Sequence, residues 1–173
     1  MIATFPPKQT QVCAFTLGEH LFGIDVRYVQ EVLRFQECTP IPLTPPLVKG
    51  LLNLRGQIVL AIDMRPRLGL PEQPRGSSPI SIVVRIADGV LSFLVDEIFD
   101  VMSLDSAQFE ATPETLSNNE KRFVSGCFKL DDRILIMLDA SQIADISADL
   151  RSALEGQRLM PELDVLACPS ACT

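Results

Sequence analysis

An internal repeat constrains the fold of this sequence more than any other feature. Residues 15–33 recur as residues 84–102, and seven apolar positions of the first segment meet apolar positions of the second. Residues 50–63 recur as residues 126–139, with four identities: Gly50, Leu54, Ile58 and Asp63 match Gly126, Leu130, Ile134 and Asp139. A duplicated unit with matching strand patterns predicts two similar small β subdomains side by side.

Short apolar runs separated by turn residues predict that strands dominate each copy. The expected strands are 12–17, 21–24, 51–54, 57–62, 80–86, 90–95, 123–130 and 133–138. Short strands with close turns favour small closed barrels over an open α/β sheet. Residues 58–62 are apolar throughout, so we expect one face of that strand in a barrel core and the other against a helix or the sibling barrel.

Two segments have helical spacing instead. Asp25 is expected to cap a short helix through Arg34, with Val26, Val29 and Val32 on a face that we interpret as core rather than docking surface. Residues 141–154 form the second candidate helix. Asp63 and Asp139 follow equivalent strands, and we predict that both cap short helical turns.

The chain reads as one domain with a lead-in and a tail. Its 173 residues suffice for a core without disulfides. We expect a disordered lead-in over 1–11, a domain over 12–154 with approximate halves 12–70 and 80–146, and a weakly patterned tail over 155–173. A connector rich in Pro, Gly and Ser separates the halves.

Composition argues against several classes of function. A net charge of −7 argues against nucleic-acid binding, which needs a basic surface. The apolar runs are too short for insertion into a membrane. Five scattered cysteines favour a reducing compartment over a disulfide framework. The single histidine, His20, lies in an expected turn, so we expect no metal site, no cofactor and no catalytic centre.

The turn at Arg55-Gly56 is the most informative candidate for a binding site. Gly56 supplies the positive φ that a tight hairpin turn requires, which leaves the Arg55 side chain for other contacts. A solvated arginine is the common outcome at such a tip, yet arginine also anchors interfaces through its planar fork. The equivalent residue of the second copy is Asp131, so the two halves are expected to meet different surfaces.

Four motifs, in order, resemble those of the CheW family of chemotaxis coupling proteins, over about residues 12 to 146. They are F-T-L-G with F-G-I-D-V-R-Y-V-Q-E-V (15–18 and 22–32), V-K-G-L-L-N-L-R-G-Q-I-V-L-A-I-D (48–63), V-D-E-I-F-D-V-M-S-L (95–104) and G-C-F-K-L-D-D-R-I-L-I-M-L-D (126–139). Two positions depart from the pattern: Cys127 and Phe128 stand where aliphatic residues are expected.

The resemblance implies a mostly β fold of two SH3-like five-stranded barrels with short helices, and no catalysis or cofactor. It implies a cytoplasmic adaptor at membrane-associated receptor arrays, bridging the chemoreceptor tip and the regulatory domain of a CheA-type histidine kinase. The receptor-facing residues, carried over by motif, are Val29 and Glu31 on the first helix and Arg55 and Ile58 on the hairpin, with Gly50 and Gly56 as turn positions.

Two alternatives stay open at this point. The same coupling role could serve a type IV pilus or another alternative chemosensory pathway. A two-barrel enzyme belongs to a different class, and the lone His20 and the lack of a phosphate-binding motif count against it.

Overall fold

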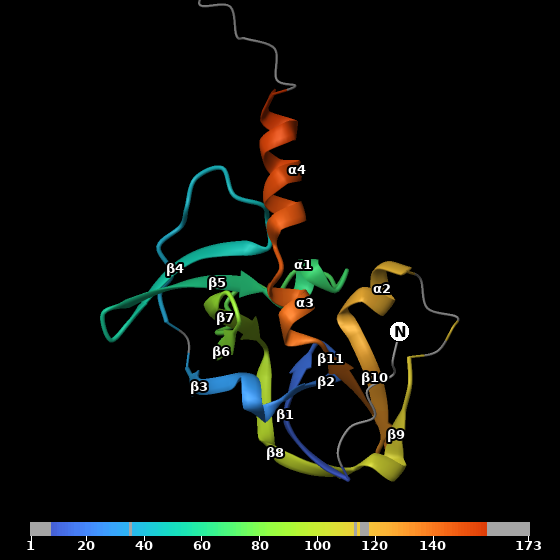
Figure 1. Cartoon of the computed structure of the whole chain (residues 1–173). Helices are drawn as coiled ribbons and strands as arrows, with labels where there is room; N and C mark the ends of the chain where they lie inside the picture. The colour runs from blue at the N-terminus through green and yellow to red at the C-terminus, as the bar shows by residue number, and fades with distance from the viewer. Residues whose placement is uncertain (1–7, 35, 113, 115–117, 159–173) are drawn as a thin grey trace, which may run out of the picture.

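A computed structural model describes residues 8–34, 36–112, 114 and 118–158 (Figure 1). The strands are β1 (Gln9–Leu17), β2 (His20–Asp25), β3 (Val29–Leu33), β4 (Val48–Leu54), β5 (Gln57–Asp63), β6 (Ile80–Ile86), β7 (Gly89–Val95), β8 (Glu97–Asp105), β9 (Phe109–Glu110), β10 (Val124–Lys129) and β11 (Ile134–Leu138). The helices are α1 (Met64–Arg67), α2 (Asn118–Phe123), α3 (Ala140–Ala144) and α4 (Ser147–Arg158), and the 3₁₀ turns are η1 (Val26–Tyr28) and η2 (Ser106–Gln108).

The strands form two sheets, which confirms the mostly β fold with two small subdomains. Sheet A has the order β8-β1-β2-β11-β10-β9, and sheet B has the order β3-β6-β7-β5-β4. Each sheet contains one parallel pair, β2 with β11 and β5 with β7, and the other pairs are antiparallel. Sheet A therefore has one strand more than the five expected, the two-residue β9.

The repeat and the sheets do not share boundaries. Sheet B takes β3, β4 and β5 from the first copy and β6 and β7 from the second, while sheet A takes β1 and β2 from the first and the others from the second. The third strands are exchanged: Ile98 pairs with Phe15, and its repeat equivalent Val29 pairs with Val84. The halves 12–70 and 80–146 are thus interlocked, and neither forms a sheet alone.

The pairing register repeats between the two sheets. Ile136 faces Phe22 in sheet A, and the equivalent Leu60 faces Leu91 in sheet B. Gly50 and Gly126 occupy matching β-bulges. Gly50 therefore lies within β4 rather than at a turn, and a Cβ there would come within 2.3 Å of the carbonyl oxygen of Thr39.

Each sheet has its own apolar core, and a third core joins them. Phe128 and Leu135 belong to the core of sheet A, and Val59 and Ala61 belong to that of sheet B. The shared core draws buried side chains from both sheets and from α3, among them Phe15, Phe22, Ile62, Phe93, Leu138 and Ile143. Because β5 contributes Val59 and Ala61 to one core and Ile62 to the other, the expectation is confirmed for residues 59–62, whereas Ile58 is exposed.

The helix expected over 25–34 is wrong. Asp25 does act as a cap, because its Oδ1 accepts a hydrogen bond from the backbone N–H of Arg27 at 2.9 Å. The segment then makes only the turn η1 and continues as β3, which pairs with β6. Val29 is only partly buried and Val32 is 44% exposed, so the expected core face does not form either.

The other predictions, which concern helix caps, the helix over 141–154 and the domain boundaries, are confirmed only in part. Asp63 and Asp139 accept backbone hydrogen bonds at the starts of α1 and α3, so both predicted caps are confirmed. The single helix expected over 141–154 is divided into α3 and α4. Strand β1 begins at Gln9, inside the expected lead-in, and α4 ends at Arg158; residues 1–7 and the tail from 159 lie outside the described residues. No helix in the described ranges is long and apolar enough to cross a membrane.

Candidate partner-binding surface

The four predicted site residues come from β3 and from the β4–β5 hairpin, at the two ends of the order of sheet B. The segment that follows β3 contacts β4 through an isolated bridge, in which Thr39 and Leu51 exchange two backbone hydrogen bonds of 2.9 and 2.8 Å. At the tip, Arg55 Nη2 lies 3.2 Å from Glu31 Oε2. The structure therefore brings Glu31 and Arg55 together, although Glu31 lies on a strand and not on a helix.

The hairpin turn presents Arg55 to solvent. Arg55 and Gly56 both have positive φ, 52° and 89°, as a two-residue primed turn requires. The Gly56 N–H donates to Asn53 Oδ1 at 2.9 Å, which holds the tip closed. The prediction for Gly56 is confirmed. The Arg55 side chain is 84% exposed while Glu31 is only 22% exposed, so the carboxylate holds one side of a guanidinium that stays open to a partner.

The apolar members of the set differ in access. Ile58 is 60% exposed and pairs with Asn53 behind the tip, so its side chain is available for contact. Val29 packs partly against the shared core. An exposed isoleucine beside an exposed arginine is the combination of apolar area and planar charge found at interface anchors.

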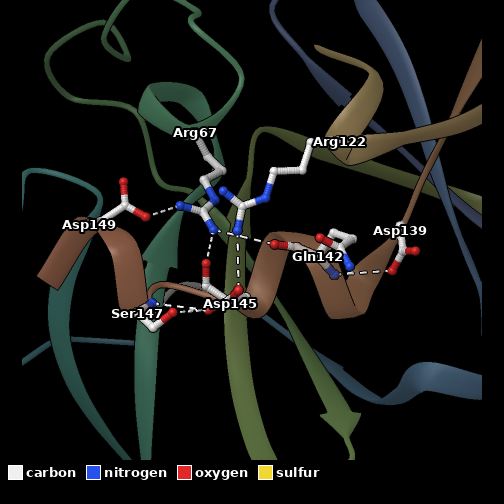
Figure 2. Close-up of polar contacts among 7 residues, drawn as sticks. All are labelled: Arg67, Arg122, Asp139, Gln142, Asp145, Ser147 and Asp149. Carbon is white, nitrogen blue, oxygen red and sulfur yellow. Dashed lines mark hydrogen bonds and ion pairs between the residues drawn. The ribbon is translucent and has the colours of Figure 1, made fainter. Parts of the chain in front are cut away.

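A second cluster, formed by two arginines, fixes the direction of α4 (Figure 2). The Arg67 side chain is 4% exposed and donates to the Asp149 carboxylate, to the carbonyl of Asp145 and, at 3.3 Å, to that of Gln142. Arg122 contacts Asp145 Oδ2 at 3.1 Å. Helix α4 then stands away from the two sheets (Figure 1), so this cluster ties its first turn to the body of the molecule.

Two further contacts complete this arginine cluster. The guanidinium carbons of Arg67 and Arg122 lie 4.8 and 5.5 Å from the ring centroid of Phe123, within cation–π range. The side chain and backbone N–H of Ser147 hydrogen-bond to Asp145, and with the charges of both arginines they lower the pKa of its carboxyl. Sequence reasoning missed this cluster, because its members are scattered and only the pattern Arg-Pro-Arg in α1 marks it.

Asp96 links the two sheets at the crossover from β7 to β8. Its carboxylate accepts from Arg65 and, at 2.7 Å, from the backbone N–H of Gly18 in the β1–β2 turn. Arg65 also donates to the carbonyl of Pro71 at 2.8 Å. These charged groups border a cleft of about 400 Å³, and their contacts there are structural.

The other candidates for chemistry are plain surface and core groups. His20 is exposed at the start of β2. Cys13, Cys38 and Cys127 are free thiols, and burial raises the pKa of each, which disfavours the reactive thiolate. In the described part of the chain, no group of three or more His, Cys, Asp or Glu side chains could hold a metal ion.

Comparison with known proteins decides the family. The model of the CheW-like domain matches residues 11–147. The chain belongs to the CheW-like domain family. It is 33% identical over 129 residues to the chemotaxis protein CheW of Klebsiella aerogenes, covering 75% of this chain and 78% of that one. CheW of Bacillus subtilis is 27% identical over 135 residues, which cover 78% of this chain and 86% of the relative.

A solved structure agrees with the fold. The crystal structure of the scaffolding protein TtCheW from Thermoanaerobacter tengcongensis superposes with a TM-score of 0.69 at 31% identity, covering 75% of this chain and 88% of that chain. The two sheets described above are accordingly the two SH3-like subdomains of the CheW fold. The resemblance inferred from the four sequence motifs is confirmed.

Proposed function

We propose that this CheW-family chain is a non-enzymatic adaptor that couples chemoreceptors to a CheA-type histidine kinase in chemotaxis. The observation that carries the proposal is the pairing of Glu31 with Arg55 beside exposed Ile58, at the position where the family motif N-L-R-G forms a hairpin tip. The match of the family model across 11–147 supports the same role.

The geometry suits a receptor tip as the partner of this surface. The family resemblance implies that the chemoreceptor tip is a helical hairpin, and a surface helix presents a polar face beside an apolar one. Arg55 supplies a fork of donors for a carboxylate, and Ile58 supplies apolar area. Because Glu31 already orients the guanidinium, less side-chain entropy is lost on binding.

The kinase and the cellular location belong to the same proposal. An adaptor needs a second partner, and we assign that role to the regulatory domain of the kinase, bound in the cytoplasm beneath the membrane-anchored receptors. We expect micromolar-class affinity, about −8 kcal/mol, because arrays gain strength from many weak contacts.

A binding titration with a soluble receptor-tip fragment tests the proposal. Arg55→Glu should weaken binding by about thirtyfold, roughly 2 kcal/mol, because it removes an interface arginine and adds repulsion. Arg75→Glu is the matched control, since it makes the same charge change at an exposed site in the connector. Equal binding by wild type, Arg55→Glu and Arg75→Glu would show that the tip is not the docking site.

A further inference from the structure

Two arginines of the short helix α1 are buried. The Arg65 and Arg67 side chains are 7% and 4% exposed, and Met64 beside them belongs to the shared core. Burial of a guanidinium is costly unless a carboxylate pairs with it, and each of these arginines is paired with an aspartate. The position of these partners in the fold indicates what the buried charges stabilise.

Arg65 connects α1, which follows β5 of sheet B, to strands of sheet A. Its Nε donates to Asp96 Oδ1 at 3.2 Å, and its Nη2 donates to the other carboxylate oxygen. Asp96 stands between β7 of sheet B and β8 of sheet A. Asp96 also accepts from the N–H of Gly18 at 2.7 Å, and its own N–H donates to the carbonyl of Thr16 in β1 at 3.1 Å. Arg65 therefore holds the crossover between the sheets in place.

Arg67 connects the same helix to elements that adjoin sheet A. It donates to the carbonyls of Gln142 and Asp145 and to the carboxylate of Asp149, all of which follow β11 (Figure 2). Its guanidinium also lies over the ring of Phe123, which directly precedes β10. Both arginines of α1 thus join sheet B to sheet A.

The second copy of the repeat lacks this pair of arginines. Helix α3 is the repeat equivalent of α1, because each begins directly after a capping aspartate at the end of a strand. Ser141 stands at the position of Arg65, and Ile143 stands at the position of Arg67. The two copies have therefore diverged at the helix that contacts the other sheet.

The two crossovers between the sheets differ in the same way. In the described residues the chain passes between sheets from β2 to β3 and again from β7 to β8. At the first crossover Arg27, the repeat equivalent of Asp96, pairs with Asp25 at 2.6 Å, but its side chain is 76% exposed. Water and salt screen an exposed pair, so it restrains the backbone weakly. Buried charge holds the second crossover alone.

We propose that Arg65 and Arg67 are positioning residues that fix the angle between the two sheets, and we name them, with Asp96 and Asp149, the α1 clamp. The shared apolar core holds the sheets together, but apolar contact is non-directional. The planar fork of a guanidinium accepts carboxylates in a narrow range of orientations, so each ion pair opposes rotation of one sheet against the other.

The functional part of this inference rests on the proposed adaptor role. The receptor-facing residues Glu31, Arg55 and Ile58 all belong to sheet B or its hairpin. A receptor bound there keeps a fixed orientation to a kinase that contacts sheet A only while the angle between the sheets is fixed. Variants of the α1 clamp should therefore bind the receptor tip normally but lose receptor control of the kinase.

Residual dipolar couplings of the backbone amides, measured by NMR on the full chain, report the angle between the sheets. One alignment tensor should fit both sheets of the wild type. The double variant Arg65→Met/Arg67→Met should require a separate tensor for each sheet, because the donors are lost while the apolar stems are kept. The aspartates left behind are 20% and 33% exposed, so they stay in contact with water. Each single variant should show a smaller change of the same kind, which decides the question if the double variant does not fold.

Two controls separate the angle from stability and from charge. Arg27→Met removes an exposed arginine paired with an aspartate at the other crossover, and one tensor should still fit both sheets. Val59→Ala lowers stability through the core of sheet B and should also keep one tensor. An unchanged single tensor in the folded clamp variants, or two tensors in Val59→Ala, would overturn the inference.

Receptor-tip binding and kinase autophosphorylation test the functional part. The folded clamp variants should bind a soluble receptor-tip fragment like the wild type, because the Glu31–Arg55 pair is unchanged, and receptor control of the kinase should be lost. Normal control by a variant whose sheets have changed their angle would contradict the functional part. If the wild type itself gives no receptor control, the adaptor role fails, and the dipolar couplings still decide whether the α1 clamp fixes the angle.

Discussion

Substitution of Gly50 tests how the segment at Thr39 packs against β4 of sheet B. Its φ of 145° lies outside the range that residues with a Cβ favour, and a Cβ at this position would meet the oxygen and carbon of Thr39 at 2.3 and 2.7 Å. Both contacts are with backbone, so no side-chain rotation relieves them. Gly50→Ala must therefore push residue 39 away from β4 or distort the bulge.

The magnitude follows from two contributions. Forcing alanine into an unfavourable backbone conformation costs about 1–3 kcal/mol. Displacing Thr39 breaks its two hydrogen bonds with Leu51, each worth about 1 kcal/mol. Gly50→Ala should thus lower the free energy of unfolding by about 3–5 kcal/mol, which for a chain of this size shifts the melting temperature by roughly 10 °C.

Urea denaturation followed by circular dichroism measures this loss against a matched control. Gly69 also has positive φ, 67°, but a Cβ there meets nothing within 4 Å. Gly69→Ala should cost only about 1–2 kcal/mol, the penalty of the left-handed conformation. Equal losses for the two variants would refute the argument that close approach to Thr39 is what requires glycine at position 50.

Three further predictions concern the charged clusters. Arg67→Met keeps the apolar stem but removes the hydrogen-bond donors that hold α4. Hydrogen exchange in α4 should therefore accelerate, and the free energy of unfolding should fall by about 2 kcal/mol. Unchanged protection of α4 would contradict this role of Arg67. The lowered pKa of the Asp145 carboxyl means that its ionised form stabilises the fold at pH values above the ordinary pKa of 3.8. This contribution is lost as the pH falls below 3.8. Hydrogen exchange of α4 measured over a pH series should show the loss, and Asp145→Asn should abolish that pH dependence. Glu31→Gln should change stability by less than about 1 kcal/mol, because Arg55 is mostly exposed, and a larger loss in thermal melts would make the pair structural.

Most strands and caps could be predicted from the sequence because their signals are local. The alternation in β6 and the turn at Arg55-Gly56 need no tertiary information, and neither do the caps Asp63 and Asp139. The β3 segment failed for a specific reason. A bulge between Val29 and Glu31 adds one residue, so Val29 and Val32 face the neighbouring Val84 and Ile82 on one side of the sheet with a spacing of three. That spacing imitates a helix.

Strand exchange and the arginine cluster could not be predicted for a different reason. Both β3 and β8 carry the repeat pattern, so each satisfies the requirements of either sheet, and only the crossover geometry decides between them. Arg67 and Asp149 are far apart in sequence, and nothing local indicates that they meet. The Glu31–Arg55 contact could be predicted in part. Both residues belong to the family motifs, but only the structure shows that they lie side by side.

The measurement that tests the adaptor role most directly is kinase coupling in a reconstituted system. Receptor-tip assemblies and the cognate CheA-type kinase are mixed with ATP, and kinase autophosphorylation is followed with and without this chain. We expect the wild type to place kinase activity under receptor control, and we expect folded Arg55→Glu to fail at concentrations where Arg75→Glu succeeds. Kinase activity that does not respond to the wild-type chain at saturating concentration, or that responds equally to Arg55→Glu, would contradict the account.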